Sequence, residues 1–201
     1  MDEGYIKFNL VWKKDKPVNR HKIQQINDWR SRLFELGLIG VYQNGIGFGN
    51  ISIRSGDNDF LITGSATGGI KQLNENHYAV VNEYDLRKNN LVCTGPVKAS
   101  SESLTHAVIY ECSPQSNAVI HIHNLTMWKQ LLFVKPTTSV SVPYGTPEMA
   151  EEIKRLFEDG SLSREKVIVM GGHEEGIIAF GETVNEAGEL LLRLQKQINS
   201  L

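Results

Sequence analysis

The sequence predicts a layered protein of the α/β or α+β class. Short apolar segments with the composition of strands follow one another through residues 50–94 and return near 120, 168 and 178. Amphipathic helical patterns lie before, between and after them. No internal repeat, low-complexity segment or linker interrupts the chain. Strands mixed with helices in this way form a sheet covered by helices, and a length of 201 residues predicts one domain, residues 1–201.

Composition and charge exclude several classes of protein. Hydrophobic residues make up 40% of the chain and charged residues 22%, and the formal net charge is −2 without a long basic run. This balance argues against general nucleic-acid binding, and no stretch is apolar for long enough to span a bilayer. The first residues lack the pattern of a secretory signal. Together with only two cysteines, Cys93 and Cys112, this predicts a cytoplasmic protein with reduced thiols.

The first part of the chain predicts an arm, a helix and a glycine-rich approach to a strand. Residues 5–12 form a short strand or an arm. Asn19 then caps an amphipathic helix that Gly37 ends. The alternating glycines of residues 45–49 resemble a dinucleotide loop, but a strand follows them and not a helix. The spacing therefore favours a hairpin bulge, in which glycine backbone can also approach a ligand closely.

The middle of the chain predicts strands followed by a helix with a polar start. Residues 60–63 form a strand, 64–69 a loop of small residues, and 78–82 with 91–94 a hairpin. The next helix begins within residues 99–103, where Ser100 or Ser101 can act as the cap. Glu102 lies in its first turn, where an acidic side chain complements the helix dipole. His106 follows one turn later, and we expect it to pack in the core.

Two strands in the second half of the chain end in histidines. The strand of residues 117–123 carries His121 and His123, whose side chains point to the same face. A short helix from Asn124 follows, and we expect a strand at 138–142, a helix from Pro147 to Phe157, strands at 167–170 and 177–180, and a last helix at 184–198. His173 comes after the third of these strands.

The histidines predict a metal centre. Two imidazoles side by side at a strand end can hold one metal ion, and a third ligand from His173 would leave a coordination position open for a substrate. The alternative is a set of core histidines satisfied by hydrogen bonds, and the His-x-His pattern favours metal. Two families with this pattern do not fit, because no glutamate follows within residues 125–129 as in cupins, and Asn124-Leu125-Thr126 replaces the further ligands of metallo-β-lactamases.

Several segments together resemble the class II aldolase/adducin family from about the first helix to the last. The matching segments are Gly49-Asn50-Ile51-Ser52-Ile53-Arg54, residues 61–69, Ser100-Ser101-Glu102 with His106, residues 117–123, Pro143-Tyr144-Gly145-Thr146 and residues 176–179. The resemblance implies a three-layer αβα class II aldolase-like fold with a central, mostly antiparallel sheet. It also implies that His121, His123 and His173 bind Zn2+ or another divalent metal ion, that Glu102 moves protons at the reacting carbon, and that Asn50, Thr67, Gly68, Ser100 and Ser101 bind a phosphate.

The function that the resemblance implies is that of a metal-dependent aldolase-like enzyme, a lyase acting on a small sugar or sugar phosphate through a metal-stabilised enediolate. Two alternatives remain, a sugar-phosphate epimerase or dehydratase on the same scaffold and a non-catalytic adducin-like interaction module. The resemblance further implies a homotetramer with the active site near a subunit boundary. Trp128 and Phe133 are candidate contact residues.

Two departures from the family pattern narrow the chemistry. His173 is separated from Gly176 by Glu174 and Glu175, either of which could compete for the metal. The aldolases of the family supply a tyrosine as the proton donor for the leaving aldehyde, and no tyrosine lies between His123 and Pro143. Tyr144 is the nearest, in a turn that reads as structural. The sequence therefore predicts proton exchange next to a carbonyl more readily than carbon–carbon cleavage.

Overall fold

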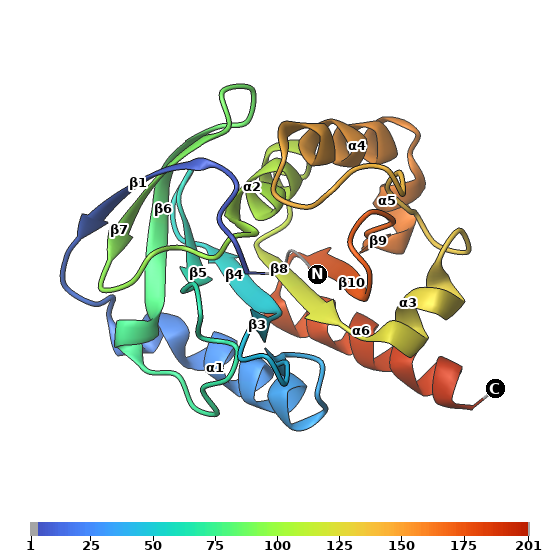
Figure 1. Ribbon diagram of the computed structural model, residues 1–201, viewed down its shortest axis with the longest axis horizontal. Coiled ribbons are helices and arrows are strands. Elements are labelled where there is room, and N and C mark those ends of the chain that lie inside the picture. Colours follow the sequence, from blue (N-terminus) through green and yellow to red (C-terminus); the bar gives the residue numbers. More distant parts are fainter. Residues whose placement is uncertain (1–3, 201) are drawn as a thin grey trace.

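The computed structural model describes residues 4–200, and one large sheet organises them (Figure 1). In spatial order its eight strands within these residues are β1 (Asn9–Lys14), β7 (Asn90–Gly95), β6 (Tyr78–Asp85), β5 (Phe60–Thr63), β4 (Asn50–Arg54), β8 (Ala118–His123), β10 (Gly176–Gly181) and β9 (Val167–Val169). Only β1 and β7 pair in parallel, while the other neighbours are antiparallel. The mostly antiparallel sheet that the family resemblance implied is thus confirmed.

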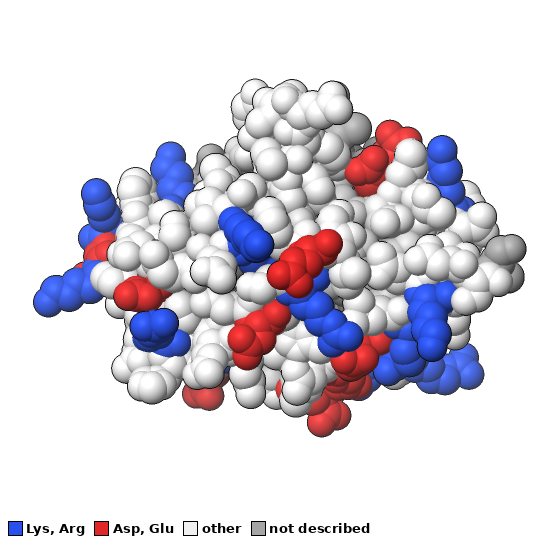
Figure 2. Space-filling view, turned by 90° about the horizontal axis from the view of Figure 1, so that it is seen from below, with Lys and Arg blue, Asp and Glu red and all other residues white. Residues whose placement is uncertain are grey.

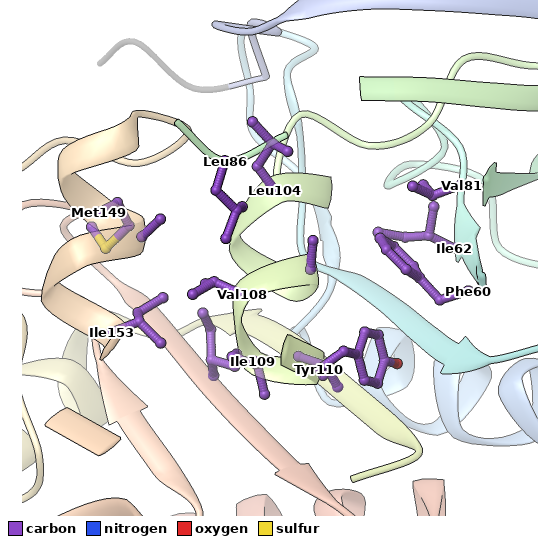
Figure 3. Close-up of a cluster of buried hydrophobic side chains, with 14 of the residues drawn as sticks. Phe60, Ile62, Val81, Leu86, Leu104, Val108, Ile109, Tyr110, Met149 and Ile153 are labelled. Atoms are coloured by element: carbon purple, nitrogen blue, oxygen red, sulfur yellow. The ribbon is translucent and has the colours of Figure 1, made fainter. Parts of the chain in front are cut away.

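Helices cover both faces of the sheet and make three layers (Figure 1). On one side lie α1 (Arg20–Glu35), α3 (Leu125–Leu131) and α6 (Val184–Asn199), and on the other lie α2 (Ser103–Cys112), α4 (Pro147–Glu158) and α5 (Ser161–Glu165). Each face buries its own hydrophobic cluster. Figure 3 shows Val108 and Ile109 of α2 packed toward Met149 and Ile153 of α4. Burial of this apolar surface is the main force that holds the layers together.

Three helices start at capping residues that the sequence offers, whereas α2 begins after Glu102 without the side-chain cap expected from Ser100 or Ser101. The side chain of Asn19 accepts a hydrogen bond from His21 N at the start of α1, and Asn124 accepts one from Met127 N at the start of α3. Thr146 caps α4 in the same way, with Pro147 at the first helical position. Each cap satisfies an amide that the helix itself leaves unpaired. These helix starts were predicted correctly.

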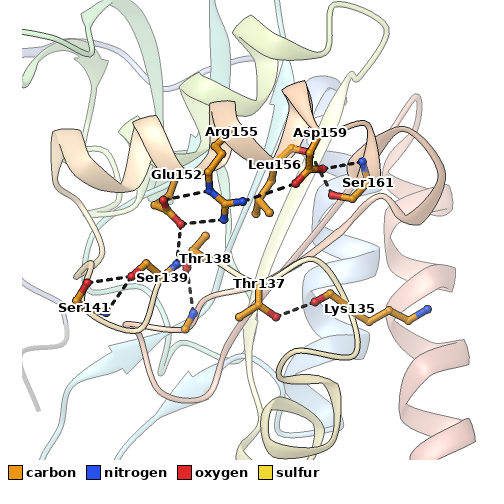
Figure 4. Close-up of polar contacts among 11 residues, drawn as sticks. Lys135, Thr137, Thr138, Ser139, Ser141, Glu152, Arg155, Leu156, Asp159 and Ser161 are labelled. Carbon is orange, nitrogen blue, oxygen red and sulfur yellow. Dashed lines mark hydrogen bonds and ion pairs between the residues drawn. The ribbon is translucent and has the colours of Figure 1, made fainter.

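The strand expected at residues 138–142 is wrong. This segment is a loop, and its neighbour Thr137 forms only an isolated bridge with Val169. The loop is fixed to α4, because Ser139 N donates to Glu152 Oε2 at 2.7 Å, and Arg155 donates to the same carboxylate (Figure 4). Alternation of Ser and Val resembles a half-buried strand, but side-chain hydrogen bonds hold this backbone instead.

A short helix and a 3-10 turn were not predicted, whereas the glycine-rich segment forms part of a hairpin, as its spacing indicated. The helix α5 follows Gly160, whose φ of 75° lies in the left-handed region that favours glycine. A short hairpin of β2 (Gly40–Val41) and β3 (Gly47–Phe48) stands apart from the main sheet, and a 3-10 turn η1 (Glu75–His77) precedes β6. The hairpin matters for function, because it carries the glycine-rich segment toward β4.

Acidic and basic side chains alternate over the face that Figure 2 shows, and no broad region of one sign appears there. One pair of opposite charges, Arg32 and Glu189 at 3.1 Å, joins α1 to α6. Among residues 4–200, none of the helices combines the length and the hydropathy that a membrane crossing requires.

Candidate metal centre

Two of the predicted ligands lie on β8, an interior strand between β4 and β10. All six residues of β8 are buried. His121 pairs with Asn50 of β4 and Ile178 of β10, and His123 pairs with Gly176 of β10. Because side chains alternate along a strand, both imidazoles face the layer of α2 and α4, while Ile120 and Ile122 pack into the opposite cluster. The alternation expected from the sequence is therefore confirmed.

The third histidine comes from the turn between β9 and β10. His173 N donates to Met170 O at 3.1 Å, and Gly176 N donates to His173 O at 2.9 Å. A Cβ atom at Gly176 would lie 2.5 Å from His173 Cδ2 and 3.2 Å from His121 Nε2. Glycine is therefore required at Gly176 for the two imidazoles to approach each other.

Packing of the 138–142 loop fixes this turn from outside. A Cβ atom at Gly171 would overlap with the carbonyl oxygen of Thr138, and one at Gly172 with that of Val142. Gly171 N also donates to Thr138 Oγ1 at 3.0 Å. The loop that is anchored to α4 thus determines where His173 stands.

The three imidazoles converge. One ligand nitrogen from each of His121, His123 and His173 lies within 4.8 Å of the others, and all three side chains are buried. Among residues 4–200, His121 Nε2 has no hydrogen-bond partner. A buried polar atom without a partner is costly unless a ligand satisfies it. Three imidazoles facing one point fit a divalent ion with an open coordination position, and imidazole suits zinc, copper, iron and nickel alike.

Burial also keeps two of these imidazoles in the form that binds metal. Loss of solvation lowers the pKa of His121 well below its usual value, and the neighbouring His123 and His173 lower it further. Burial likewise lowers the pKa of His173, with contributions from His123 and Lys7. Neutral imidazole offers a lone pair to a metal ion, whereas protonated imidazole does not.

Glu102 lies beside the histidines and does not cap its helix. It occupies the residue before α2, its side chain makes no capping hydrogen bond, and it is 1% exposed. Its Oε1 atom is 3.9 Å from His173 Nε2. A role as a helix-end charge would place the carboxylate on the amides of α2. The observed position instead favours a role at the metal centre.

A cavity of about 240 Å³ adjoins the centre and is lined by the residues that were predicted to bind phosphate. Asn50, Thr67, Gly68, Ser100 and Ser101 all line it, together with the glycine-rich segment that ends at Gly49. Asn50 connects the two sites, because its Nδ2 atom is 3.4 Å from His121 Nδ1. The structure therefore brings the five residues together next to the histidines, and their binding role stays a prediction.

No pattern in the sequence indicated the hydrogen-bonded chain behind His123. The hydroxyl of Tyr42 is 2.8 Å from His123 Nδ1 and donates to Glu175 Oε2 at 2.6 Å. Since that proton goes to Glu175, the Tyr42 oxygen can only accept from His123 Nδ1, which leaves Nε2 for a metal. Hydrogen bonding to His123 and Tyr42 lowers the pKa of Glu175 and favours its carboxylate form. Glu174 is exposed, and the group of converging ligand atoms consists of the three histidines without Glu175.

Tyr144 is closer to the centre than its turn suggested. Its ring is buried and lies 4.5 Å from the ring of His173, between centroids. Its hydroxyl accepts a hydrogen bond from Tyr5 N at 3.3 Å, and Lys7 Nζ lies 3.8 Å from its ring centroid. The ring therefore supports His173, while the hydroxyl holds the segment before β1.

Comparisons with known proteins agree with this geometry. Residues 41–199 match the model of the family described as Class II Aldolase and Adducin N-terminal domain. A 3-oxo-tetronate 4-phosphate decarboxylase of Haemophilus influenzae is 28% identical over 75% of this chain and 80% of its own. An L-fuculose phosphate aldolase of Methanocaldococcus jannaschii is 30% identical over 69% and 75%. The solved sugar-phosphate aldolase of Thermotoga maritima superposes with a TM-score of 0.67 at 18% identity, over 90% of this chain and 93% of that one.

Proposed function

Because the chain belongs to the class II aldolase and adducin family, we propose that it is a metal-dependent, aldolase-like lyase acting on a small sugar or sugar phosphate. One observation carries this proposal, namely that three buried imidazoles converge beside a buried carboxylate and a polar cavity. Such a set is unusual in a structural core, because burial of imidazoles and a carboxylate costs free energy that apolar side chains would avoid.

The proposed division of labour follows from the positions of the side chains. His121, His123 and His173 would hold a divalent ion, which supplies a Lewis acid for adjacent carbonyl and hydroxyl oxygens of a substrate. Glu102, 3.9 Å from His173 Nε2, takes and returns the proton at the carbon next to that carbonyl. Its near-complete burial excludes water, which keeps the proton on a defined path.

The cavity supplies the means to hold the other end of the substrate. Ser100, Ser101 and Thr67 offer hydroxyl groups, Asn50 offers an amide, and Gly68 offers backbone. Such donors suit a phosphate or a sugar hydroxyl. Since Asn50 contacts both sites, a substrate held in the cavity would present its reacting carbons to Glu102 and the metal.

A decarboxylation is the second candidate reaction. Cleavage that releases an aldehyde also requires transfer of the proton of the hydroxyl that becomes the aldehyde oxygen, and residues 124–142 contain no tyrosine to carry it. Carbon dioxide leaves from a carboxylate that is already deprotonated, so no such transfer is needed when the carboxyl group is on the carbon next to a ketone. The electron pair of the broken bond passes into an enolate that a metal ion would stabilise, and Glu102 returns a proton to its carbon. One of the two relatives described above is a decarboxylase, which agrees with this alternative.

We further propose that the protein assembles as a homotetramer. Phe133 and Val134 are 74% and 72% exposed, and Val140 lies in the loop that packs on the His173 turn. A contact between copies would bury these side chains. Trp128 is only partly exposed and donates through Nε1 to Met170 O, so it is less suited to such a contact.

Metal analysis and a substrate screen test the proposed function. Protein purified without chelators should carry about one divalent ion per chain, and the His121→Ala/His123→Ala double variant should carry none. Only when the metal is present should the wild-type protein exchange a proton of a hydroxyketone or its phosphate, or cleave or decarboxylate such a compound. Metal binding that survives in the double variant refutes the centre, and an inactive metal-loaded protein would favour an interaction module.

A further inference from the structure

A buried positive charge lies behind the wall of the cavity. Arg30 belongs to α1 and is 1% exposed. Its Nη1 donates to Lys71 O at 2.8 Å, and its Nη2 donates to Gly68 O at 2.6 Å and Thr67 O at 3.2 Å. Within residues 4–200, all of its hydrogen bonds thus end on main-chain carbonyls. Within these residues the guanidinium forms no ion pair with a carboxylate, and its hydrogen-bond partners belong to the loop that lines the cavity.

These contacts fix the direction of the loop amides. In a trans peptide unit the C=O of one residue and the N–H of the next point to opposite sides. Because Thr67 C=O points to Arg30, the N–H of Gly68 points away from Arg30. Gly68 lines the cavity, whereas Arg30 does not. The buried charge therefore aims a donor toward the cavity side of the loop.

The same loop holds a run of unused donors. Gly64 N and Ser65 N donate to His77 O and Lys98 O. The four amides that follow, at residues 66–69, donate no hydrogen bond to any residue that the structure describes. Ala66 has a φ of 61°, in the left-handed region. Successive backbone amides around such a residue form a concave site for an anion.

The loop cannot easily shift to another conformation. A Cβ atom at Gly68 would overlap with the carbonyl oxygen of Gly40 and lie 2.9 Å from the Cα atom of Gly47. The β2–β3 hairpin therefore holds one side of the loop and Arg30 holds the other. The guanidinium holds three carbonyls with two nitrogens, Nη1 on Lys71 O and Nη2 on Thr67 O and Gly68 O. The single nitrogen of a lysine ammonium replaces this planar fork poorly.

We propose that Arg30 is a positioning residue for a phosphate subsite, which holds the carbonyls of Thr67 and Gly68 so that the amide of Gly68 faces the cavity. This rests on the proposed function and deepens it, because it assigns a phosphorylated substrate to the site. The charge of Arg30 also favours an anion in the cavity, since a guanidinium stays protonated at neutral pH. The reacting end of the substrate stays with Glu102 and the histidines.

A pair of arginine variants tests this role. Arg30→Lys keeps the charge but loses the fork. Arg54→Lys is the matched control, because Arg54 donates to the carbonyls of Ser116, Asp57 and Tyr110, none of which lines the cavity. Calorimetry measures binding of inorganic phosphate and dihydroxyacetone phosphate to each protein, and a chelator titration measures Zn2+ binding.

The two variants should differ. Arg30→Lys should weaken binding of both phosphate compounds by about tenfold or more, the value of one well-aligned donor to a charged group, without changing Zn2+ affinity. Arg54→Lys should change neither. Unchanged phosphate binding in Arg30→Lys, or an equal loss in Arg54→Lys, overturns the assignment.

A measurement on the wild-type protein covers the case in which Arg30→Lys fails to fold. In a phosphate titration followed by amide NMR, the chemical shift of the Gly68 N–H should change by more than that of most other amides. Saturable phosphate binding that leaves this resonance unmoved overturns the proposal, and so does an absence of phosphate binding. Neither result refutes the proposed reaction, because metal-dependent exchange with an unphosphorylated ketose would still show it.

Discussion

Replacing Tyr42 by Phe isolates the hydrogen-bonded chain behind His123. The change removes the hydroxyl that lies 2.8 Å from His123 Nδ1 and donates to Glu175 at 2.6 Å. The ring keeps its packing on Phe48, 4.5 Å away between centroids. Loss of such an outer partner typically weakens metal binding by about 10- to 100-fold, or roughly 1.4–2.8 kcal/mol. Glu175 Oε2 remains 3.8 Å from His123 Nδ1, and because it can move in and accept that proton, we expect a loss near the lower limit.

A competition titration of Zn2+ against a chromophoric chelator measures this loss at fixed pH. Tyr78→Phe is the control, because Tyr78 is buried and its hydroxyl donates to Asn27 Oδ1 at 2.5 Å on α1. That variant should lose about 1 kcal/mol of folding stability and keep its Zn2+ affinity. Equal Zn2+ affinities for the Tyr42→Phe and wild-type proteins would refute the reasoning, as would an equal loss in the Tyr78→Phe control.

Three further predictions concern the turn, the core and the assembly. Gly172→Ala should displace the turn that carries His173, because the added methyl group meets Val142 O. The variant should lose about 1–3 kcal/mol of folding free energy in urea unfolding and should bind Zn2+ more weakly. Wild-type stability and wild-type Zn2+ affinity would contradict this prediction. Burial lowers the pKa of His106 from 6.5 to about 3, so only the unfolded chain binds this proton between those values. Folding stability should therefore fall as pH falls through that window, by up to about 1.4 kcal/mol per pH unit from this group, and His106→Asn should flatten the dependence; an unchanged slope counts against it. Light scattering should give the mass of a tetramer for the wild-type protein and a smaller mass for Phe133→Glu. A wild-type monomer at micromolar concentration argues against the proposed assembly.

Local patterns in the sequence predicted much of the fold and the candidate site. The strand that carries His121 and His123 is a continuous apolar run, and the two-residue period alone places both imidazoles on one face. Asn19, Asn124 and Thr146 cap their helices with their own side chains. These features depend on residues within a few positions of one another, so a single sequence contains them.

Long-range contacts explain what the sequence left out. Tyr42 reaches Glu175 across 133 positions, and no local pattern marks either residue as part of a metal centre. No local pattern distinguishes Arg30 from the other charges of its amphipathic helix, yet it is 1% exposed and donates to three carbonyls of the loop. The 138–142 segment alternates like a strand, but Glu152 on α4 and the glycines before His173 hold it as a loop. In each case tertiary contacts override the local preference.

Proton exchange in deuterated water tests the central claim most directly. The Zn2+-loaded wild-type protein and Glu102→Gln are each incubated with dihydroxyacetone phosphate, and NMR follows deuterium incorporation beside the carbonyl. Glu102→Gln should keep its fold and its Zn2+ but lose exchange by roughly two to four orders of magnitude, because we propose that the buried carboxylate beside His173 is the group that carries the proton. Exchange at the wild-type rate in Glu102→Gln would contradict the account.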